Sequence, residues 1–185
     1  MTHPYQSMNA SPPFTLKKLD QWILSVNRSL MITLLGVMSA IIFVSVSIRY
    51  LSDYSIPWAE EVSRYLMVWL MFLGIGPVMR LGGHIAIDTF PKTLSGTSAI
   101  ILRGIIALII SAFFMTLLWV GWLYMQKTIP QSTAVLEISF AWVSSSVPIG
   151  FALALWHGVA VAVPYVNNGA YETSDDLNID EVGAI

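Results

Sequence analysis

Long apolar stretches without any charge dominate the hydrophobic pattern of this chain. Three of them contain no Asp, Glu, Lys or Arg, and they cover residues 29–48, 104–126 and 138–164. A helix of about 20 residues crosses the hydrocarbon core of a bilayer, which is about 30 Å thick, because each residue adds about 1.5 Å. Each of the three stretches therefore predicts a transmembrane helix.

A fourth apolar stretch, residues 65–79, is too short to span a bilayer alone. A glycine pair follows it and predicts the helix end, so the missing length has to come from the N-terminal side, through residues 60–64. Pro57 is suited to the first turn of this helix, since proline lacks the backbone N–H that a first turn leaves unused. We expect the second span at about 56–80, with ionisable residues near the membrane edge.

The segments on either side of the spans carry different patterns. Four apolar residues ahead of the first span share one helical face: Leu19, Trp22, Ile23 and Val26. They predict a short amphipathic helix in the membrane plane, within an N-terminal segment of residues 1–27. The tail, residues 167–185, has five acidic and no basic residues and is expected to be disordered. The predicted fold class is an all-α integral membrane protein, with four transmembrane helices in one domain, residues 28–166.

Composition agrees with a membrane protein and excludes several classes of function. Hydrophobic residues make up 56% of the 185 residues and charged residues 11%, with mean hydropathy +0.70, whereas soluble domains carry about 25% charge. A net charge of −2 provides no basic surface for nucleic acid. The absence of cysteine excludes thiolate catalysis and cysteine-based metal sites, and three histidines are too few for a multi-histidine metal site. We therefore expect no enzyme activity, bound metal or cofactor in this chain.

Basic residues are distributed unevenly between the two ends of the predicted spans. Six lie on the side that holds the N-terminus: Lys17, Lys18, Arg28, Arg80, Lys92 and Arg103. Three lie on the other side: Arg49, Arg64 and Lys127. Since cytoplasmic loops carry the excess of Lys and Arg, both termini are predicted to be cytoplasmic.

Charged and aromatic residues gather at the start of the second span: Trp58, Glu60, Glu61, Arg64 and Tyr65. Glu60 and Arg64 are four residues apart in the favourable acid-first order, so we expect them to pair. This leaves Glu61, which has only Tyr65 four residues along the helix, in want of a partner near the membrane edge, where an unpaired charge is costly. Two interpretations stay open. Either the two aromatic residues anchor the helix at the interface beside solvated carboxylates, or Glu61 contacts a basic or hydrogen-bond donor group of another subunit.

A second polar group follows the same span: Arg80, His84 and Asp88, around the glycine pair. The glycines permit a tight turn, and charge-assisted hydrogen bonds among the three side chains would hold the loop in place. A proton relay through His84 is an alternative, because an unperturbed histidine has a pKa of about 6.5. We expect the structural role.

Small residues recur at every fourth position of the fourth span: Ser146, Gly150, Ala154, Gly158 and Ala162. Such a ridge lets another helix approach closely and predicts a packing face, within this subunit or against another one. Pro148 should kink the helix and free a carbonyl near residue 144, which the hydroxyls of residues 144–146 or a neighbouring helix would satisfy. His157, in the same span, is expected to be buried and to donate a hydrogen bond to a neighbouring helix.

Several motifs give the chain a family resemblance. They are Trp58-x-Glu60-Glu61-x-x-Arg64-Tyr65-Leu66, Trp69, Phe72-Leu73-Gly74, Arg80-x-Gly82-x-His84-Ile85-x-Ile87-Asp88 and Val147-Pro148-Ile149-Gly150-Phe151. With these motifs, residues 28–164 resemble the small permease subunits of tripartite ATP-independent periplasmic (TRAP) transporters. The two charged motifs together are specific, and neither tail takes part in the resemblance.

The resemblance implies a four-helix, DctQ-like subunit in a bacterial inner membrane. Its partners would be a large TRAP membrane subunit, which carries the sodium and substrate sites, and a periplasmic substrate-binding protein that delivers an organic acid. The sodium gradient would drive uptake without ATP, and sialic acid and C4-dicarboxylates are the leading candidate substrates. The small subunit would scaffold the large one in membrane lipid, with Asp53, Lys127 and Glu137 in loops that help to dock the binding protein.

Two other functions are weighed against this one. A cytochrome b-like redox subunit would need paired histidines in its spans, and His157 is the single histidine in a predicted span. A channel would need a filter segment or a ring of charged residues, and neither is evident. No internal repeat is evident either, which favours a subunit over a complete carrier.

Overall fold

The computed structural model describes residues 14–80 and 96–168, and this part of the chain is mainly helical. Its helices are α1 (Phe14–Ser52), α2 (Pro57–Arg80), α4 (Thr97–Thr128), α5 (Ala141–Ser144) and α6 (Ser146–Asn168). With α5 and α6 counted as one interrupted span, four spans in the described residues are long and apolar enough to cross a membrane. The prediction of an all-α membrane protein with four spans is confirmed.

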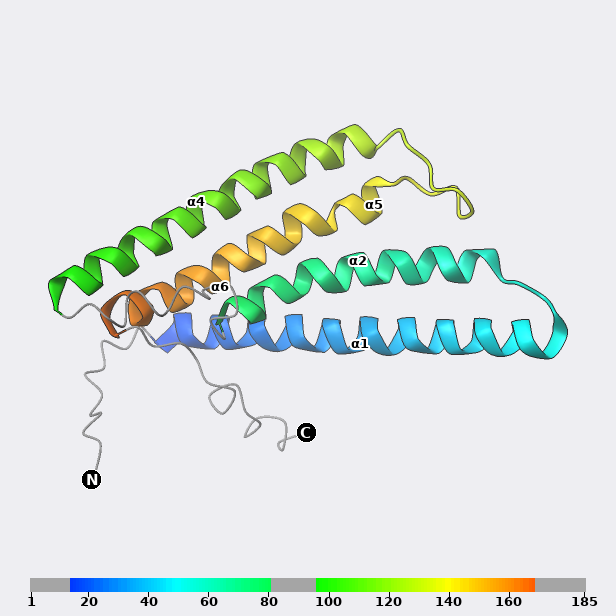
Figure 1. Ribbon diagram of the computed structural model, residues 1–185, viewed down its shortest axis with the longest axis horizontal. Coiled ribbons are helices and arrows are strands. Elements are labelled where there is room, and N and C mark those ends of the chain that lie inside the picture. The colour runs from blue at the N-terminus through cyan, green and yellow to red at the C-terminus, as the bar shows by residue number, and fades with distance from the viewer. Residues whose placement is uncertain (1–13, 81–95, 169–185) are drawn as a thin grey trace, which may run out of the picture.

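The four spans lie side by side in the order α4, α6, α2 and α1 (Figure 1). The core between α2, α4 and α6 contains Met79, Phe114, Phe151 and Ala154, and the Phe72 ring meets Phe151 edge-on at a centroid distance of 5.8 Å. The outer helices are α1 and α4, and in each only 6% of an apolar stretch of 18 residues is buried. Their outer surfaces are therefore left for lipid or for another protein.

The first span is one continuous helix, α1, of 39 residues. At about 1.5 Å per residue it is about 58 Å long, well beyond a bilayer core of about 30 Å. No proline or glycine interrupts residues 14–35, so the helix runs straight through the segment expected to lie in the membrane plane. A separate amphipathic helix is therefore not confirmed. Trp22 is 64% exposed, while the polar Asp20 and Asn27 turn towards α2.

The side of α1 that packs on α2 follows a heptad-like spacing. Its less exposed residues recur in steps of three and four: Asp20, Leu24, Asn27, Met31, Leu34, Met38, Ile41, Ser45 and Ile48. This spacing keeps one stripe of a helix against its neighbour over many turns. Two members of the stripe, Asn27 and Ser45, are buried polar residues. A single stripe thus attaches α1 to the rest of the subunit.

Pro77 lies inside α2 without ending the helix. Proline cannot donate a backbone hydrogen bond, so the carbonyl of Leu73, four residues earlier, loses its helical donor. The side-chain amide of Asn27 donates to that carbonyl across the α1–α2 interface at 3.1 Å, and Asn27 is only 3% exposed. One buried asparagine therefore satisfies the backbone group that the proline leaves.

The last span is interrupted at Ser145, three residues before Pro148. Three successive serine hydroxyls donate to the carbonyl three residues back: Ser144 to Ala141 at 3.3 Å, Ser145 to Trp142 at 2.8 Å and Ser146 to Val143 at 2.7 Å. The serines thus bond to the carbonyls of residues 141–143, and what satisfies the carbonyl that Pro148 frees near residue 144 stays a prediction. The hydroxyls of Thr128 and Ser144, 2.6 Å apart, tie the end of α4 to this interruption.

Candidate functional site

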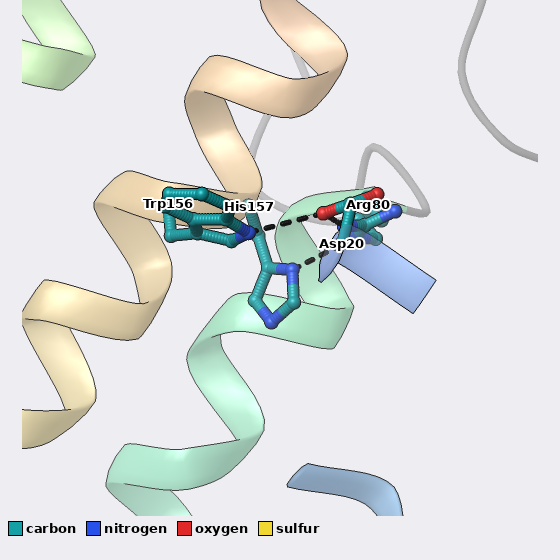
Figure 2. A network of polar contacts seen from close by, with 4 residues as sticks. All are labelled: Asp20, Arg80, Trp156 and His157. Carbon is teal, nitrogen blue, oxygen red and sulfur yellow. Dashed lines mark hydrogen bonds and ion pairs between the residues drawn. The ribbon is translucent and has the colours of Figure 1, made fainter. Parts of the chain in front are cut away.

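Polar side chains gather at both ends of α2. The Glu61 cluster, at the start of the helix, consists of Glu61, Tyr65, Val135 and Leu136. The Arg80 cluster, at its end, consists of Asp20, Arg80, Trp156 and His157 (Figure 2). The interval from Glu61 to Arg80 along α2 is about 28 Å at about 1.5 Å per residue. The two clusters are therefore separated by about the thickness of a bilayer core, which is about 30 Å.

Glu61 is buried, at 7% exposure, and donors from its own chain surround its carboxylate. One oxygen, Oε2, accepts the backbone N–H of Val135 at 2.8 Å and that of Leu136 at 3.2 Å. The other oxygen, Oε1, accepts the hydroxyl of Tyr65, one turn further along α2, at 2.5 Å. The expectation that Glu61 lacks a partner within this chain is wrong, because a loop that begins far downstream supplies its donors.

The loop that meets Glu61 is a short hairpin formed by residues 131–139, called here the 131–139 hairpin. An antiparallel backbone bridge closes its base, and Thr133 donates its N–H to the Ile138 carbonyl at 2.9 Å. The backbone turns at Glu137, whose φ of 54° lies in the left-handed region. With the two N–H groups of its tip on Glu61, the hairpin is bonded to α2 as well as to itself.

Glu60 pairs with Arg49 of α1, and not with Arg64 of its own helix. The last turn of α1 and the first turn of α2 are neighbours, so the pair between helices forms in place of the pair within one helix. Both side chains are about half exposed, at 48% and 57%, which makes this a surface ion pair. Within the described part of the chain, Arg64 is exposed and forms no ion pair. The predicted Glu60–Arg64 pair is therefore wrong.

The other residues predicted at this end of the helices are all exposed: Asp53, Trp58, Lys127 and Glu137. Trp58, at 47% exposure, is free to lie in a membrane interface, as the anchoring interpretation requires. Asp53 has a φ of 52° in the turn between α1 and α2. Tyr65 differs from Trp58, since its hydroxyl is bonded to Glu61.

The Arg80 cluster joins three helices (Figure 2). Arg80 forms an ion pair with Asp20 of α1 and donates its Nε–H to Nδ1 of His157, on α6, at 2.8 Å. The indole N–H of Trp156 donates to the same Asp20 oxygen at 3.1 Å. Arg80 is 2% exposed and His157 is 0% exposed, so the charge of Arg80 is balanced inside the protein rather than by water. The cluster thereby fastens α1, α2 and α6 at one end.

His157 accepts a hydrogen bond from α2, whereas the sequence favours a donor. A guanidinium has only N–H donors, so the Nδ1 atom that receives Arg80 carries no proton, and a neutral ring then holds its proton on Nε2. The ring lies against Gly76, where a Cβ atom would be 2.4 Å from Cδ2 of His157. Glycine at position 76 therefore makes room for the histidine.

Some predicted features lie outside the described residues. His84 and Asp88 fall within residues 81–95, so their contacts with Arg80 stay a prediction. The tail beyond residue 168 is also outside, and its disorder stays a prediction.

The small-residue ridge of the last span meets α2 within the subunit at Gly150 and Gly158. Two of its members are completely buried: Ser146 and Ala154. A Cβ atom at Gly150 would lie 2.6 Å from the backbone oxygen of Phe72, which shows that the two backbones touch there. The contact at Gly158 is looser, with the methyl group of Met79 3.7 Å from the Cβ position. The ridge is therefore tightest near its middle.

Residues 38–166 match the family model described as "Tripartite ATP-independent periplasmic transporters, DctQ component". The match covers more than half of the chain and reaches from the middle of α1 to the end of α6. The chain belongs to the DctQ family. It is therefore a small TRAP permease, and the resemblance noted from the motifs is confirmed.

Two relatives are named as TRAP transporter small permeases. A Haemophilus influenzae protein named as a TRAP transporter small permease is 31% identical over 90 residues, which cover 49% of this chain and 56% of that protein. The sialic acid TRAP transporter small permease protein SiaQ of Vibrio cholerae is 23% identical over 137 residues, which cover 73% of this chain and 78% of that protein. The alignment with the first relative thus spans little more than half of its length. Neither relative supports the cytochrome b-like alternative.

Sequence reasoning misses several residues that form the polar contacts between the helices and with the 131–139 hairpin. Asp20 and Asn27 are seven residues apart and so share one face of α1, and this heptad spacing is the signal that could have placed them against α2. Arg49 follows from its position in the last turn of α1, next to the turn that leads into α2. The backbone N–H groups of Val135 and Leu136 leave no signal, because every residue except proline carries one.

Proposed function

We propose that this chain is the small membrane subunit of a sodium-driven TRAP transporter that takes up an organic acid delivered by a periplasmic binding protein. The family match over residues 38–166 is the observation that carries the proposal. The name of the Vibrio cholerae relative supports sialic acid as the first substrate to test, and a C4-dicarboxylate is the second.

The architecture supports a scaffold role for the subunit. The row of helices leaves wide apolar surfaces on α1 and α4, its two outer members (Figure 1). A large membrane subunit that packs on one of these surfaces would be anchored by the four helices, and lipid would cover the remaining apolar surface. The buried charges of Glu61 and Arg80 have partners in this chain, which favours sodium and substrate sites in the large subunit.

The distribution of basic residues supports an inner-membrane orientation with both termini in the cytoplasm. In this orientation the Arg80 cluster is cytoplasmic, and the Glu61 cluster and the 131–139 hairpin are periplasmic. The exposed residues Asp53, Lys127 and Glu137 then lie on the side from which the binding protein docks. An alkaline phosphatase fusion after residue 168 should be inactive and one inserted after residue 54 should be active; the reverse pattern would contradict this orientation.

Reconstitution tests the proposed function as a whole. The subunit, its large subunit and the binding protein are combined in proteoliposomes, and uptake of radiolabelled sialic acid and of succinate is measured with and without an inward sodium gradient. We expect uptake of one substrate that requires all three proteins and the gradient. Equal uptake in the absence of this subunit would contradict the proposal, as would uptake that needs no sodium.

A further inference from the structure

Glu61 joins a transmembrane helix to the tip of an extramembrane loop. Its Oε2 atom accepts two consecutive backbone N–H groups, that of Val135 at 2.8 Å and that of Leu136 at 3.2 Å. Two bonds from neighbouring N–H groups to one oxygen fix both the position and the direction of that stretch of backbone. Without this acceptor, the tip of the 131–139 hairpin would lose these two backbone hydrogen bonds to α2.

The tip presents side chains that the subunit does not cover. Val135 and Ile138 are 47% and 42% exposed, and Glu137, which lies between them in the chain, is exposed as well. A carboxylate in the middle of an apolar tip argues against insertion into hydrocarbon, where a charge is costly. The tip therefore fits a protein surface in water that offers an apolar recess and a basic residue opposite Glu137.

We propose that Glu61 is a positioning residue for docking: it holds the tip side chains Val135, Glu137 and Ile138 in the arrangement that the substrate-binding protein recognises. The inference rests on the proposed function. It adds that the hairpin tip makes the contact with the binding protein and that Glu61 keeps the backbone of the tip ordered. A pre-ordered loop binds more tightly than a mobile one, because its backbone does not have to be ordered at the moment of contact. Glu61 itself is buried and acts through the hairpin.

The expected effect is on affinity for the binding protein rather than on the rate of the docked transporter. Glu61→Ala removes the acceptor, and it should raise the half-saturating concentration of binding protein about tenfold, the factor expected from ordering about one backbone residue. The maximal rate of uptake should not change. Glu61→Gln keeps a carbonyl oxygen for the two N–H groups and offers an NH₂ group to the Tyr65 oxygen, so it should rescue affinity to within about threefold of wild type.

Two further variants separate the presented surface from its support. The double variant Val135→Ser/Ile138→Ser changes the tip side chains and leaves the backbone bonds to Glu61 in place, and it should also weaken docking about tenfold. Glu60→Gln is the matched control, since Glu60 is adjacent in sequence but paired with Arg49, and it should behave as wild type.

The experiment titrates purified binding protein onto proteoliposomes that contain the full membrane complex, and it measures uptake at each concentration. Amide hydrogen exchange reports on the hairpin separately. The N–H groups of Val135 and Leu136 should exchange faster in Glu61→Ala than in wild type, and they should be unchanged in the double tip variant.

Three results would overturn the inference. The first is a double tip variant with the same half-saturating concentration of binding protein as wild type. This result would show that the tip is not the docking surface, even if Glu61→Ala fails to assemble. The second is a lower maximal rate at unchanged half-saturation, which would place the tip against lipid or the large subunit. The third is wild-type affinity in Glu61→Ala despite faster exchange. Wild-type uptake that needs no binding protein would instead overturn the proposed function, so the two failures are distinguishable.

Discussion

Asn27 donates a hydrogen bond to the carbonyl of Leu73, the acceptor that Pro77 leaves without its helical donor. Asn27 and Leu73 are 46 residues apart in the chain, and they meet because α1 packs along α2. The bond explains a proline inside one span and a buried amide in the packing stripe of another. Each of these features alone would be unfavourable in a membrane helix.

Removal of Asn27 should destabilise the subunit by an amount that depends on Pro77. In Asn27→Leu the Leu73 carbonyl stays in an apolar interface without its donor, and the loss should be about 1 kcal/mol, a usual value for a hydrogen bond between membrane helices. In a Pro77→Ala background, residue 77 supplies its own N–H, so the same substitution should have a smaller effect. Thermal unfolding of the four purified forms measures this coupling. Equal effects in both backgrounds would argue against it.

Gly150→Ala should destabilise the subunit more than Gly158→Ala, although both change one hydrogen to a methyl group on the same ridge. At position 150 the new Cβ would meet the Phe72 backbone at 2.6 Å, and backbone cannot move aside as a side chain can. We expect a loss of about 1–3 kcal/mol there. At position 158 the nearest atom is the flexible Met79 methyl at 3.7 Å, so the change should be near neutral. Unfolding temperatures of the two variants test this order, and similar values would show that the ridge is not tight at Gly150.

The two ion pairs between α1 and α2 should differ in strength. Asp20→Asn removes a charge from beside a guanidinium that is 2% exposed, and it should destabilise by about 2 kcal/mol or more, since breaking a fully buried pair costs about 3–5 kcal/mol. Glu60→Gln breaks a half-exposed pair and should change stability by about 1 kcal/mol or less. High salt should reduce the second effect and spare the first. Melting curves at two ionic strengths provide the comparison. A larger loss of stability for Glu60→Gln than for Asp20→Asn would be incompatible with the greater burial of the Asp20–Arg80 pair.

Gly76→Ala should be tolerated better when the ring at position 157 is removed. The new Cβ would lie 2.4 Å from the His157 ring, so the single variant should push α2 and α6 apart. His157→Ala makes room but takes the acceptor from Arg80, so it should destabilise as well. The double variant should therefore lose less than the sum of the two single losses. Strictly additive unfolding free energies would mean that the ring moves away without strain.

Local pattern was enough for the number of spans and for the ends of α2, but the other helices extend beyond their charge-free stretches. Four spans follow from apolar length, and α2 begins at Pro57 and ends at Arg80 because helix ends depend on residues within a turn of them. Short sequence motifs were also enough to indicate the family. The ridge of the last span was also visible as a period of four, but its partner could be α2 or a helix of another protein, and period alone cannot choose between them.

The pairing of the charged residues was decided by the tertiary structure. Sequence spacing favours Glu60 with Arg64, yet Glu60 contacts Arg49 because the ends of two helices become neighbours. Asp20 lies on the polar side of a segment expected to rest on the membrane surface. Because α1 continues through this segment and packs along α2, Asp20 instead forms an ion pair with Arg80. Glu61 is bonded to backbone N–H groups, which have no signature in sequence. The hydropathy of a segment depends only on its own residues, so the sequence determines which segments enter the bilayer. Polar contacts between segments depend on which helices pack side by side. That arrangement is set by contacts along the whole length of the helices.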